Sequence, residues 1–210
     1  MSGRRRPRRP KTGRRTALLL LSALLPAAGC AQSAPPQPTD PTPPFAACAD
    51  LSTPPATSAD AGAAPDPDRA SVSLPDMELP CFTGGEPIQL RAVRGPAVIN
   101  LWATWCHPCR KELPVFQRAA TRLAGRVHVI GVNVRDDRGK AQALAEDFGL
   151  TFPNLFDPDD ELRRELGRPV LPITLFVDGA GQVRHVEASG ALDDAELAER
   201  IEQHLGLVVP

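Results

Sequence analysis

The stretch Asn100–Pro114, NLWATWCHPCRKELP, decides how this chain folds. It overlaps the end of a continuous apolar run, AVINLWA (97–103), of the kind that forms a buried strand. Two cysteines, Cys106 and Cys109, follow with two residues between them, and apolar residues at helical spacing come directly afterwards. A CxxC pair between a strand and a helix is typical of a redox-active site. A bound metal and a structural disulfide are the alternatives for such a pair.

The two cysteines are expected to have different roles. Cys106 would lie at the N-terminus of the helix, where unpaired backbone N–H groups and the helix dipole stabilise an anion. That position favours the thiolate, so we predict that Cys106 is the nucleophile. Cys109, one turn later and facing inward, is placed to attack the mixed disulfide and release the product. Pro108 suits the first turn because its missing N–H is not needed there, and His107 either supports the thiolate or is solvated.

The C-terminal two thirds of the chain predict an α/β domain over residues 71–210. Apolar patterns indicate a hairpin at 77–82 and 87–90, strands at 97–103, 127–134, 173–177 and 182–187, and helices after the CxxC, over 138–148, near Asp159 and from about Asp193. A helix links the first two buried strands, so these should be parallel, whereas the closing hairpin must be antiparallel. We therefore expect a mixed central sheet flanked by helices, with an N-terminal β-hairpin extension.

The first 29 residues resemble a secretory signal peptide. Eight Lys and Arg residues lie within residues 1–16, and an apolar run of about a dozen residues follows. The run is too short for a membrane-spanning helix, which needs about 20 apolar residues, and it contains Pro26. Ala27-Ala28-Gly29-Cys30 resembles the lipobox of bacterial lipoproteins. We therefore expect lipidation of Cys30; simple cleavage, which would leave a free thiol, is the alternative.

Removal of this signal would change the charge of the protein. The chain has 24 basic and 25 acidic residues; eight basic and no acidic residues lie in the signal, which leaves 16 against 25 and a net charge of −9. An acidic surface argues against nucleic acid as a partner and offers no polybasic patch for anionic lipids. We therefore expect the lipid on Cys30 to attach the protein to the extracytoplasmic face of the cell membrane.

Between signal and domain, residues 30–70 are expected to form a disordered tether. Ten prolines lie among residues 31–70, with Ala, Ser, Thr and Asp between them, and such a segment buries too little apolar surface to fold. Of the five cysteines, Cys48 and Cys81 remain after the lipid and CxxC assignments. In an exported protein we expect these two to form a structural disulfide. Otherwise one is a buried thiol and the other a free one.

WCHPCRKELP, preceded by NLWAT, resembles the thioredoxin superfamily and, within it, the TlpA/ResA-like branch of exported thiol–disulfide proteins. The resemblance covers about residues 74–207. Pro114 stands where active-site helices of thioredoxin type carry a kinking proline, and Leu171-Pro172 matches the cis-proline loop that lies opposite the CxxC. The resemblance implies a thioredoxin fold and a protein-disulfide oxidoreductase that needs no cofactor. We expect a monomer.

The resemblance also implies a substrate-binding surface around the CxxC. A cis bond before Pro172 would present the backbone of Leu171 to an extended client segment, which would then pair as an added strand. A trans proline on an edge strand is the alternative. Trp105 and His107 would also lie against the substrate, and Trp105 would shield the sulfurs.

Glu112 is the expected proton carrier of the site. Cytosolic thioredoxins have a buried aspartate where this chain has Asn100, which cannot titrate. The TlpA/ResA branch carries an acidic residue where Glu112 stands, three residues after Cys109. If Glu112 is buried there, desolvation and a nearby thiolate would both raise its pKa. An exposed helix glutamate paired with a nearby Lys or Arg is the alternative.

The function that the resemblance implies is disulfide exchange with client proteins, such as apocytochrome c or copper-site proteins, with a membrane thiol–disulfide protein as electron donor or acceptor. The sequence leaves the direction of transfer open. A Cu(I) metallochaperone would use the same thiols, but copper chaperones of this fold have three residues between their cysteines. A peroxidase would need a Thr three residues before Cys106, and a structural zinc would need a second ligand pair. We therefore expect no metal.

Overall fold

The computed structural model describes residues 42–56 and 72–210. The expected signal peptide (1–29), the expected lipidation site Cys30 and the rest of the expected tether lie outside these residues. Every described residue belongs to one compact unit within Asp40–Pro210. Within the described residues, none of the helices has both the length and the apolar character that crossing a membrane requires.

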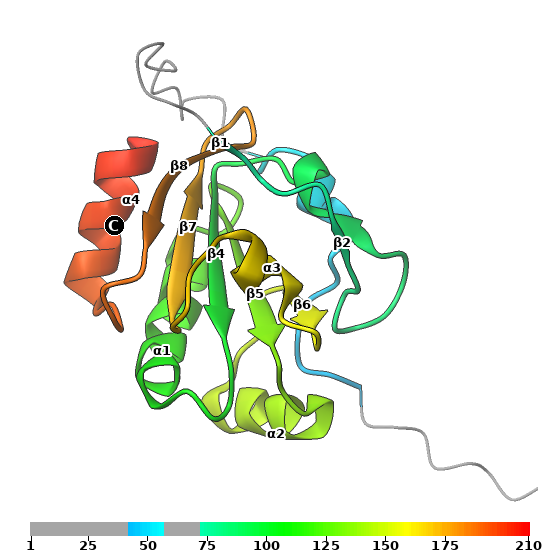
Figure 1. The fold of residues 1–210 in the computed structure, drawn as a ribbon. Coiled ribbons are helices and arrows are strands. Elements are labelled where there is room, and N and C mark those ends of the chain that lie inside the picture. Colours follow the sequence, from blue (N-terminus) through cyan, green and yellow to red (C-terminus); the bar gives the residue numbers. More distant parts are fainter. Residues whose placement is uncertain (1–41, 57–71) are drawn as a thin grey trace, which may run out of the picture. The chain divides into compact units, whose positions relative to one another are not determined.

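A mixed sheet of six strands forms the centre of this unit. The strands are β1 (Val72–Ser73), β4 (Ala97–Trp102), β5 (His128–Val134), β6 (Asn154–Asp157), β7 (Ile173–Val177) and β8 (Gln182–Glu187). Their order is β1-β8-β7-β4-β5-β6, with β4, β5 and β6 parallel and the remaining pairs antiparallel (Figure 1). The expected hairpin forms a separate sheet of β2 (Glu78–Leu79) and β3 (Ile88–Gln89).

Helices cover both faces of the central sheet. They are α1 (His107–Arg122), α2 (Arg138–Phe148), α3 (Glu161–Glu165) and α4 (Asp194–Leu205), together with the short 3-10 helices η1 (Ala49–Ser52) and η3 (Leu90–Ala92). One hydrophobic cluster includes Phe116 of α1 and Ile201 of α4. A second cluster contains Leu51 of η1, Leu79 of β2 and Leu162 of α3. Figure 1 shows α3 in front of the sheet. The predicted fold class, a mixed sheet flanked by helices, is confirmed.

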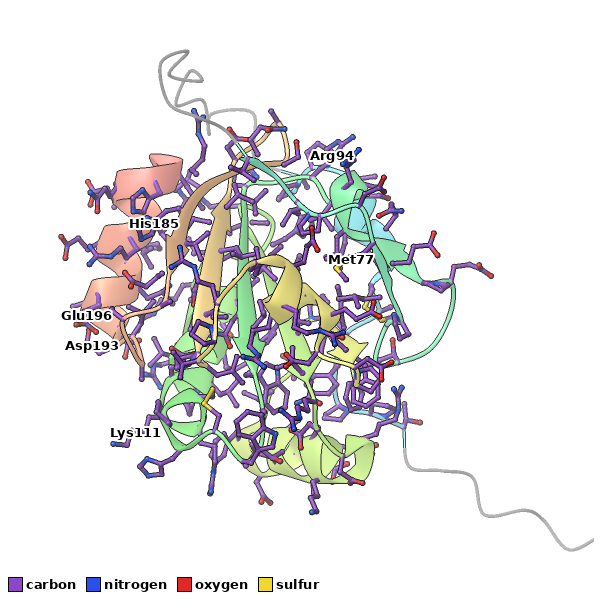
Figure 2. The ribbon with its side chains drawn as sticks, in the orientation of Figure 1. Met77, Arg94, Lys111, His185, Asp193 and Glu196 are labelled. Atoms are coloured by element: carbon purple, nitrogen blue, oxygen red, sulfur yellow. A yellow bond between two sulfur atoms is a disulfide. The ribbon has the colours of Figure 1, made fainter. Side chains whose placement is uncertain are left out.

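Local sequence signals set the ends of the helices. α2 begins after Asp137, whose side chain accepts a hydrogen bond from the Lys140 backbone N–H. It ends at Gly149, where φ is 62°, a left-handed conformation that glycine adopts readily. α4 begins with a capping box in which the side chains of Asp193 and Glu196 each accept a hydrogen bond from the other residue's backbone N–H (Figure 2). The expected helix over 138–148 matches α2.

The structure of residues 42–56 differs from the disordered tether that was predicted for residues 30–70. Phe45 is buried and packs edge-on against Phe82, with 4.8 Å between the ring centroids. Leu51 is buried in η1, and Cys48 is buried as well. The proline-rich composition of the segment indicates disorder. Three buried side chains nevertheless dock this stretch onto the domain, where a covalent bond also holds it. The folded unit therefore includes residues before the expected boundary at residue 71.

The covalent bond is a disulfide between Cys48 and Cys81, with Sγ–Sγ 2.02 Å and Cα–Cα 5.9 Å at a sequence separation of 33. Such a cross-link removes conformational freedom from the unfolded chain, so replacing both cysteines by serine should lower the free energy of unfolding by about 3 kcal/mol. Urea unfolding of the oxidised protein measures this change. The control is the double variant Cys106→Ser, Cys109→Ser, which removes a disulfide that closes a far shorter loop. Its free energy of unfolding should fall less. An unchanged value for the first variant would mean that Phe45 and Leu51 dock the segment unaided.

Candidate active site

The CxxC lies where β4 has ended and α1 begins. Cys106 is the N-cap of α1, and its sulfur accepts a hydrogen bond from the Cys109 backbone N–H at 3.2 Å. The two cysteines form a disulfide with Sγ–Sγ 2.03 Å. Cys106 is 5 % exposed and Cys109 is 0 % exposed, so a sulfur from another protein can reach only Cys106. This difference supports a nucleophilic role for Cys106 and a resolving role for Cys109.

The first turn of α1 provides a setting for a sulfur anion. His107 is its first residue and is exposed, and Pro108 follows within the first turn. Pro108 has no N–H that would need a partner in this turn, and the Cys109 N–H donates to the Cys106 sulfur. No acidic residue lies in the first turn to oppose a negative charge there.

Glu112 lies one turn after Cys109 on the same side of α1 and is completely buried. Its carboxylate accepts hydrogen bonds from Nδ2 of Asn100 at 2.7 Å and from the backbone N–H of Leu192 at 3.1 Å. Burial raises the pKa of Glu112 from 4.5 to about 7, although both hydrogen bonds favour the charged form. Glu112 is therefore not an exposed, ion-paired glutamate. A carboxyl group with this pKa can take up or release a proton near neutral pH.

The loop before β7 lies at the same end of the sheet as the CxxC. Ile173, the first residue of β7, is paired with Leu101, near the end of β4. The peptide bond between Leu171 and Pro172 is cis, Pro172 is buried and Leu171 is half-buried. A further link joins the two strands, because Nδ2 of Asn100 lies 3.3 Å from Oγ1 of Thr174. The expected client-binding loop and the disulfide are thus held by adjacent strands.

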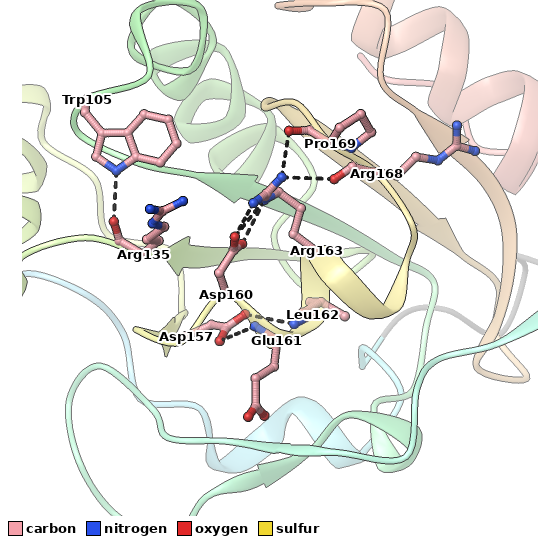
Figure 3. A network of polar contacts seen from close by, with 9 residues as sticks. All are labelled: Trp105, Arg135, Asp157, Asp160, Glu161, Leu162, Arg163, Arg168 and Pro169. Carbon is pink, nitrogen blue, oxygen red and sulfur yellow. Dashed lines mark hydrogen bonds and ion pairs between the residues drawn. The ribbon is translucent and has the colours of Figure 1, made fainter.

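The two tryptophans before the CxxC have different environments. Trp102 is buried, and its Nε1 donates a hydrogen bond to Oδ1 of Asn154 at 2.8 Å. Trp105 is 58 % exposed, and its Nε1 donates to the backbone oxygen of Arg135 at 2.9 Å (Figure 3). An exposed indole with a fixed orientation beside Cys106 is suited to contact another protein.

Asp136 is a site residue that the sequence analysis does not identify. Its carboxylate accepts hydrogen bonds from the backbone N–H of Thr104 at 2.5 Å, from Oγ1 of Thr104 at 2.6 Å and from Nδ2 of Asn133 at 2.9 Å. Asp136 therefore holds the loop that carries Cys106. The position of Asp136 just after a buried strand could have identified it, because the carboxyl ends of neighbouring parallel strands lie at the same edge of the sheet.

An Asp136→Asn variant tests this role. The amide has one acceptor oxygen, so its NH2 group would face the backbone N–H of either Thr104 or Asp137, and we expect the free energy of unfolding to fall by about 2 kcal/mol. The control is Asp137→Asn, because an amide oxygen can still accept from the Lys140 N–H that Asp137 caps. Urea unfolding of both variants gives the comparison, and an equal small loss in both would contradict the role of Asp136.

The other histidines in the described residues contact their own fold. His185 of β8 and His204 of α4 stack with 4.1 Å between ring centroids. Nε2 of His128 lies 2.9 Å from the backbone oxygen of Thr53. In residues 42–56 and 72–210, no group of three or more His, Cys, Asp or Glu side chains is arranged to hold a metal ion.

Comparisons with known proteins relate this fold and site to others. Residues 71–186 match the AhpC/TSA family. Thiol-disulfide oxidoreductase ResA of Geobacillus thermodenitrificans is 32 % identical over 140 residues, which cover 66 % of this chain and 77 % of ResA. Thiol:disulfide interchange protein DsbE of Allochromatium vinosum is 34 % identical over 131 residues, or 62 % and 69 % of the two chains. A solved structure of a DsbF homologue from Corynebacterium diphtheriae has a TM-score of 0.57 at 26 % identity, covering 65 % of this chain and 88 % of that one.

A mixed sheet with a CxxC at the start of a helix, and with a cis-proline loop at the same end of the sheet, defines the thioredoxin-like thiol–disulfide oxidoreductases. The similarity to ResA and DsbE agrees with that class. The chain belongs to the AhpC/TSA family.

Proposed function

We propose that this protein is a membrane-tethered, extracytoplasmic oxidoreductase that exchanges disulfides with client proteins through Cys106 and Cys109. The observation that carries the proposal is the disulfide at the start of α1, in which Cys106 is slightly exposed and Cys109 is buried, one helical turn before the buried Glu112. The first half of the reaction needs only the reachable sulfur. The second half needs a proton acceptor inside the protein, and Glu112 has a suitable pKa.

The first step in reduction of a client begins from the two thiols. The Cys106 thiolate attacks one sulfur of the client disulfide; a Cys106–client disulfide forms, and the other client sulfur leaves as a thiolate that takes up a proton. The exposed indole of Trp105 and the half-buried Leu171 lie on the surface that the client would cover. An extended client segment would pair with the backbone of Leu171.

The second step releases the client. Glu112 accepts the proton of the Cys109 thiol, and the resulting thiolate attacks the sulfur of Cys106. The Cys106–Cys109 disulfide forms, and the client leaves with its second sulfur as a thiolate, which is then protonated. Two electrons have passed from the two cysteines to the client. Oxidation of a client runs the same steps in reverse.

The N-terminal sequence and the relatives support the tether and the partners of this proposal. The arginine-rich leader and the lipobox-like Ala27-Ala28-Gly29-Cys30 support export and lipidation at Cys30. The similarity to ResA and DsbE supports clients with paired cysteines, and apocytochrome c and copper-site proteins are the candidates. A membrane thiol–disulfide protein would then restore the starting state of the CxxC.

The reduction potential of the Cys106/Cys109 couple tests the proposal and sets its direction. The protein from Ala31 onward, which keeps the Cys48–Cys81 disulfide, is equilibrated with glutathione, and the double variant Cys106→Ser, Cys109→Ser corrects for the other disulfide. A potential near or below about −240 mV identifies a reductase, and one above about −180 mV identifies an oxidant or isomerase of exported proteins. The absence of a reversible two-electron couple would contradict disulfide exchange and would favour the alternative, Cu(I) binding by the same thiols.

A further inference from the structure

Arg163 holds the loop that leads to the cis-proline. Its Nη1 donates hydrogen bonds to the backbone oxygens of Arg168 at 3.2 Å and Pro169 at 2.6 Å, while its Nε donates to both carboxylate oxygens of Asp160 at 2.8 and 3.0 Å (Figure 3). The side chain of Arg163 is only 17 % exposed. One guanidinium thus joins α3 to the segment that ends at Leu171.

The loop has few other contacts that could define its position. Arg168, Pro169 and Val170 are all exposed, and Val170 is 63 % exposed. Leu171, at the end of the loop, is half-buried and packs against both hydrophobic clusters. The three exposed residues before it gain little from packing, so the hydrogen bonds to their backbone determine where this part of the loop lies. The two from Arg163 are charge-assisted and come from a planar, forked donor, which also fixes their direction.

The start of α3 is anchored to the end of β6, which in turn is hydrogen-bonded to the segment after β5. The carboxylate of Asp157 accepts from the backbone N–H groups of Glu161 and Leu162, both at 2.9 Å, and so fixes the start of α3. The backbone oxygen of Asp157 accepts from the N–H of Arg135 at 2.9 Å, and the oxygen of Arg135 in turn accepts from Trp105. A continuous series of hydrogen bonds therefore connects the loop before Cys106 with α3.

Backbone strain occurs at two points of this series. In the described part of the chain, Arg135 (φ 47°) and Asp160 (φ 59°) are the only residues other than glycine with a left-handed φ. This conformation is unfavourable for residues with a side chain, and it persists where surrounding contacts hold it, often at functional sites. Asp160 is the ion-pair partner of Arg163, so one strained residue directly orients the guanidinium.

We propose that Arg163 is a positioning residue for client binding, acting through the loop from Arg168 to Leu171. By fixing the oxygens of Arg168 and Pro169, it sets the position of the Leu171 backbone, against which an extended client segment would pair. This inference rests on the proposed function and adds to it a residue that contributes to recognition of polypeptides without touching the reacting sulfurs.

Two disulfides of different size test the proposal. One is dithionitrobenzoate, and the other is an extended peptide whose single cysteine carries thionitrobenzoate. In both reactions the Cys106 thiolate forms a new disulfide, and thionitrobenzoate leaves as a coloured thiolate, because the thiol of lower pKa leaves faster. For Arg163→Met, the ratio of the peptide rate constant to the dithionitrobenzoate rate constant should fall about tenfold, the factor that 1.4 kcal/mol corresponds to.

The matched control is Arg164→Met. Arg164 is the next residue of α3 and is exposed, and within the described residues its side chain has no hydrogen bond or ion pair, so the ratio should stay at the wild-type value. In the wild type, the same peptide with alternate backbone nitrogens methylated should also show the lowered ratio, because it cannot pair as a strand. Far-UV circular dichroism checks the folding of each variant. If Arg163→Met does not fold, Arg163→Lys decides, because a single ammonium keeps the ion pair with Asp160 but loses at least one loop contact.

Three results would overturn the proposal. The first is a wild-type value for both rate constants, and hence for their ratio, in Arg163→Met, or in Arg163→Lys if that variant decides. The second is an equal loss of rate with both disulfides, which would mean that Arg163 acts on the Cys106 thiolate. The third is a wild-type protein that reacts with neither disulfide, which removes the proposed function and this inference with it.

Discussion

A Cys106→Ser variant is expected to lose disulfide exchange by more than about a thousandfold, because a serine hydroxyl is not ionised at neutral pH and cannot form the mixed disulfide. Cys106 is the only one of the two active-site sulfurs that is exposed at all, so no other group in the CxxC can replace it in the first step. The release of thionitrobenzoate from a peptide mixed disulfide measures the rate directly.

The matched variant is Cys109→Ser, which should keep the first step and lose the second. The client then stays bound to Cys106, and mass spectrometry under non-reducing conditions should detect the one-to-one adduct. The buried position of Cys109 explains the difference, since it can meet only the sulfur of Cys106. If Cys109→Ser were inactive in the first step while Cys106→Ser formed the adduct, the two roles would be reversed.

Glu112→Gln is expected to have the second largest effect, a slowing of the resolving step by about a hundredfold at pH 8, because the variant has no carboxylate to accept the Cys109 proton. In the wild type the rate of this step should rise with pH through about 7, the pKa of Glu112. The variant should lose that rise. Rapid-quench measurement of adduct decay between pH 5 and pH 9 gives both profiles.

The same variant makes a prediction about stability. The pKa of Glu112 is raised from 4.5 to about 7 in the folded protein, so the folded state holds a proton that the unfolded chain releases between these values. The stabilisation that this proton brings is fully present below pH 4.5 and is lost as the pH rises through about 7, a change of about 3 kcal/mol. Relative to Glu112→Gln, the wild type should therefore lose about that much free energy of unfolding between pH 4.5 and pH 8.

Glu146→Gln is the control for both measurements, because Glu146 is an exposed glutamate of α2. It should follow the wild-type pH profiles of rate and stability. If Glu112→Gln and the wild type share one profile of adduct decay, the proton of Cys109 leaves by another route. If the free energies of unfolding of the wild type and of Glu112→Gln changed in parallel with pH, Glu112 would not keep its proton near neutral pH.

The sequence alone determined the fold class and the central chemistry of this protein. The CxxC between an apolar run and a helical pattern, and the Leu171-Pro172 pair before a strand, are local features. Helix α2 and its glycine stop were likewise readable, because caps and periodicity act over a few residues. The short strands β1 and β6 were not predicted, since two and four residues carry no periodicity of their own.

Only the tertiary structure decided what surrounds the sulfurs. Asp136 holds Thr104 across 32 positions of sequence, and Arg163 holds the backbone of the exposed residues Arg168 and Pro169. The pKa of Glu112 is set by burial within the folded protein and by hydrogen bonds from Asn100 and Leu192, which belong to other segments. Residues 42–56 dock although their composition indicates disorder. Apart from the contacts of Arg163, which span five and six positions, the deciding contacts join segments far apart in the chain, and neither composition nor periodicity records which surfaces will meet.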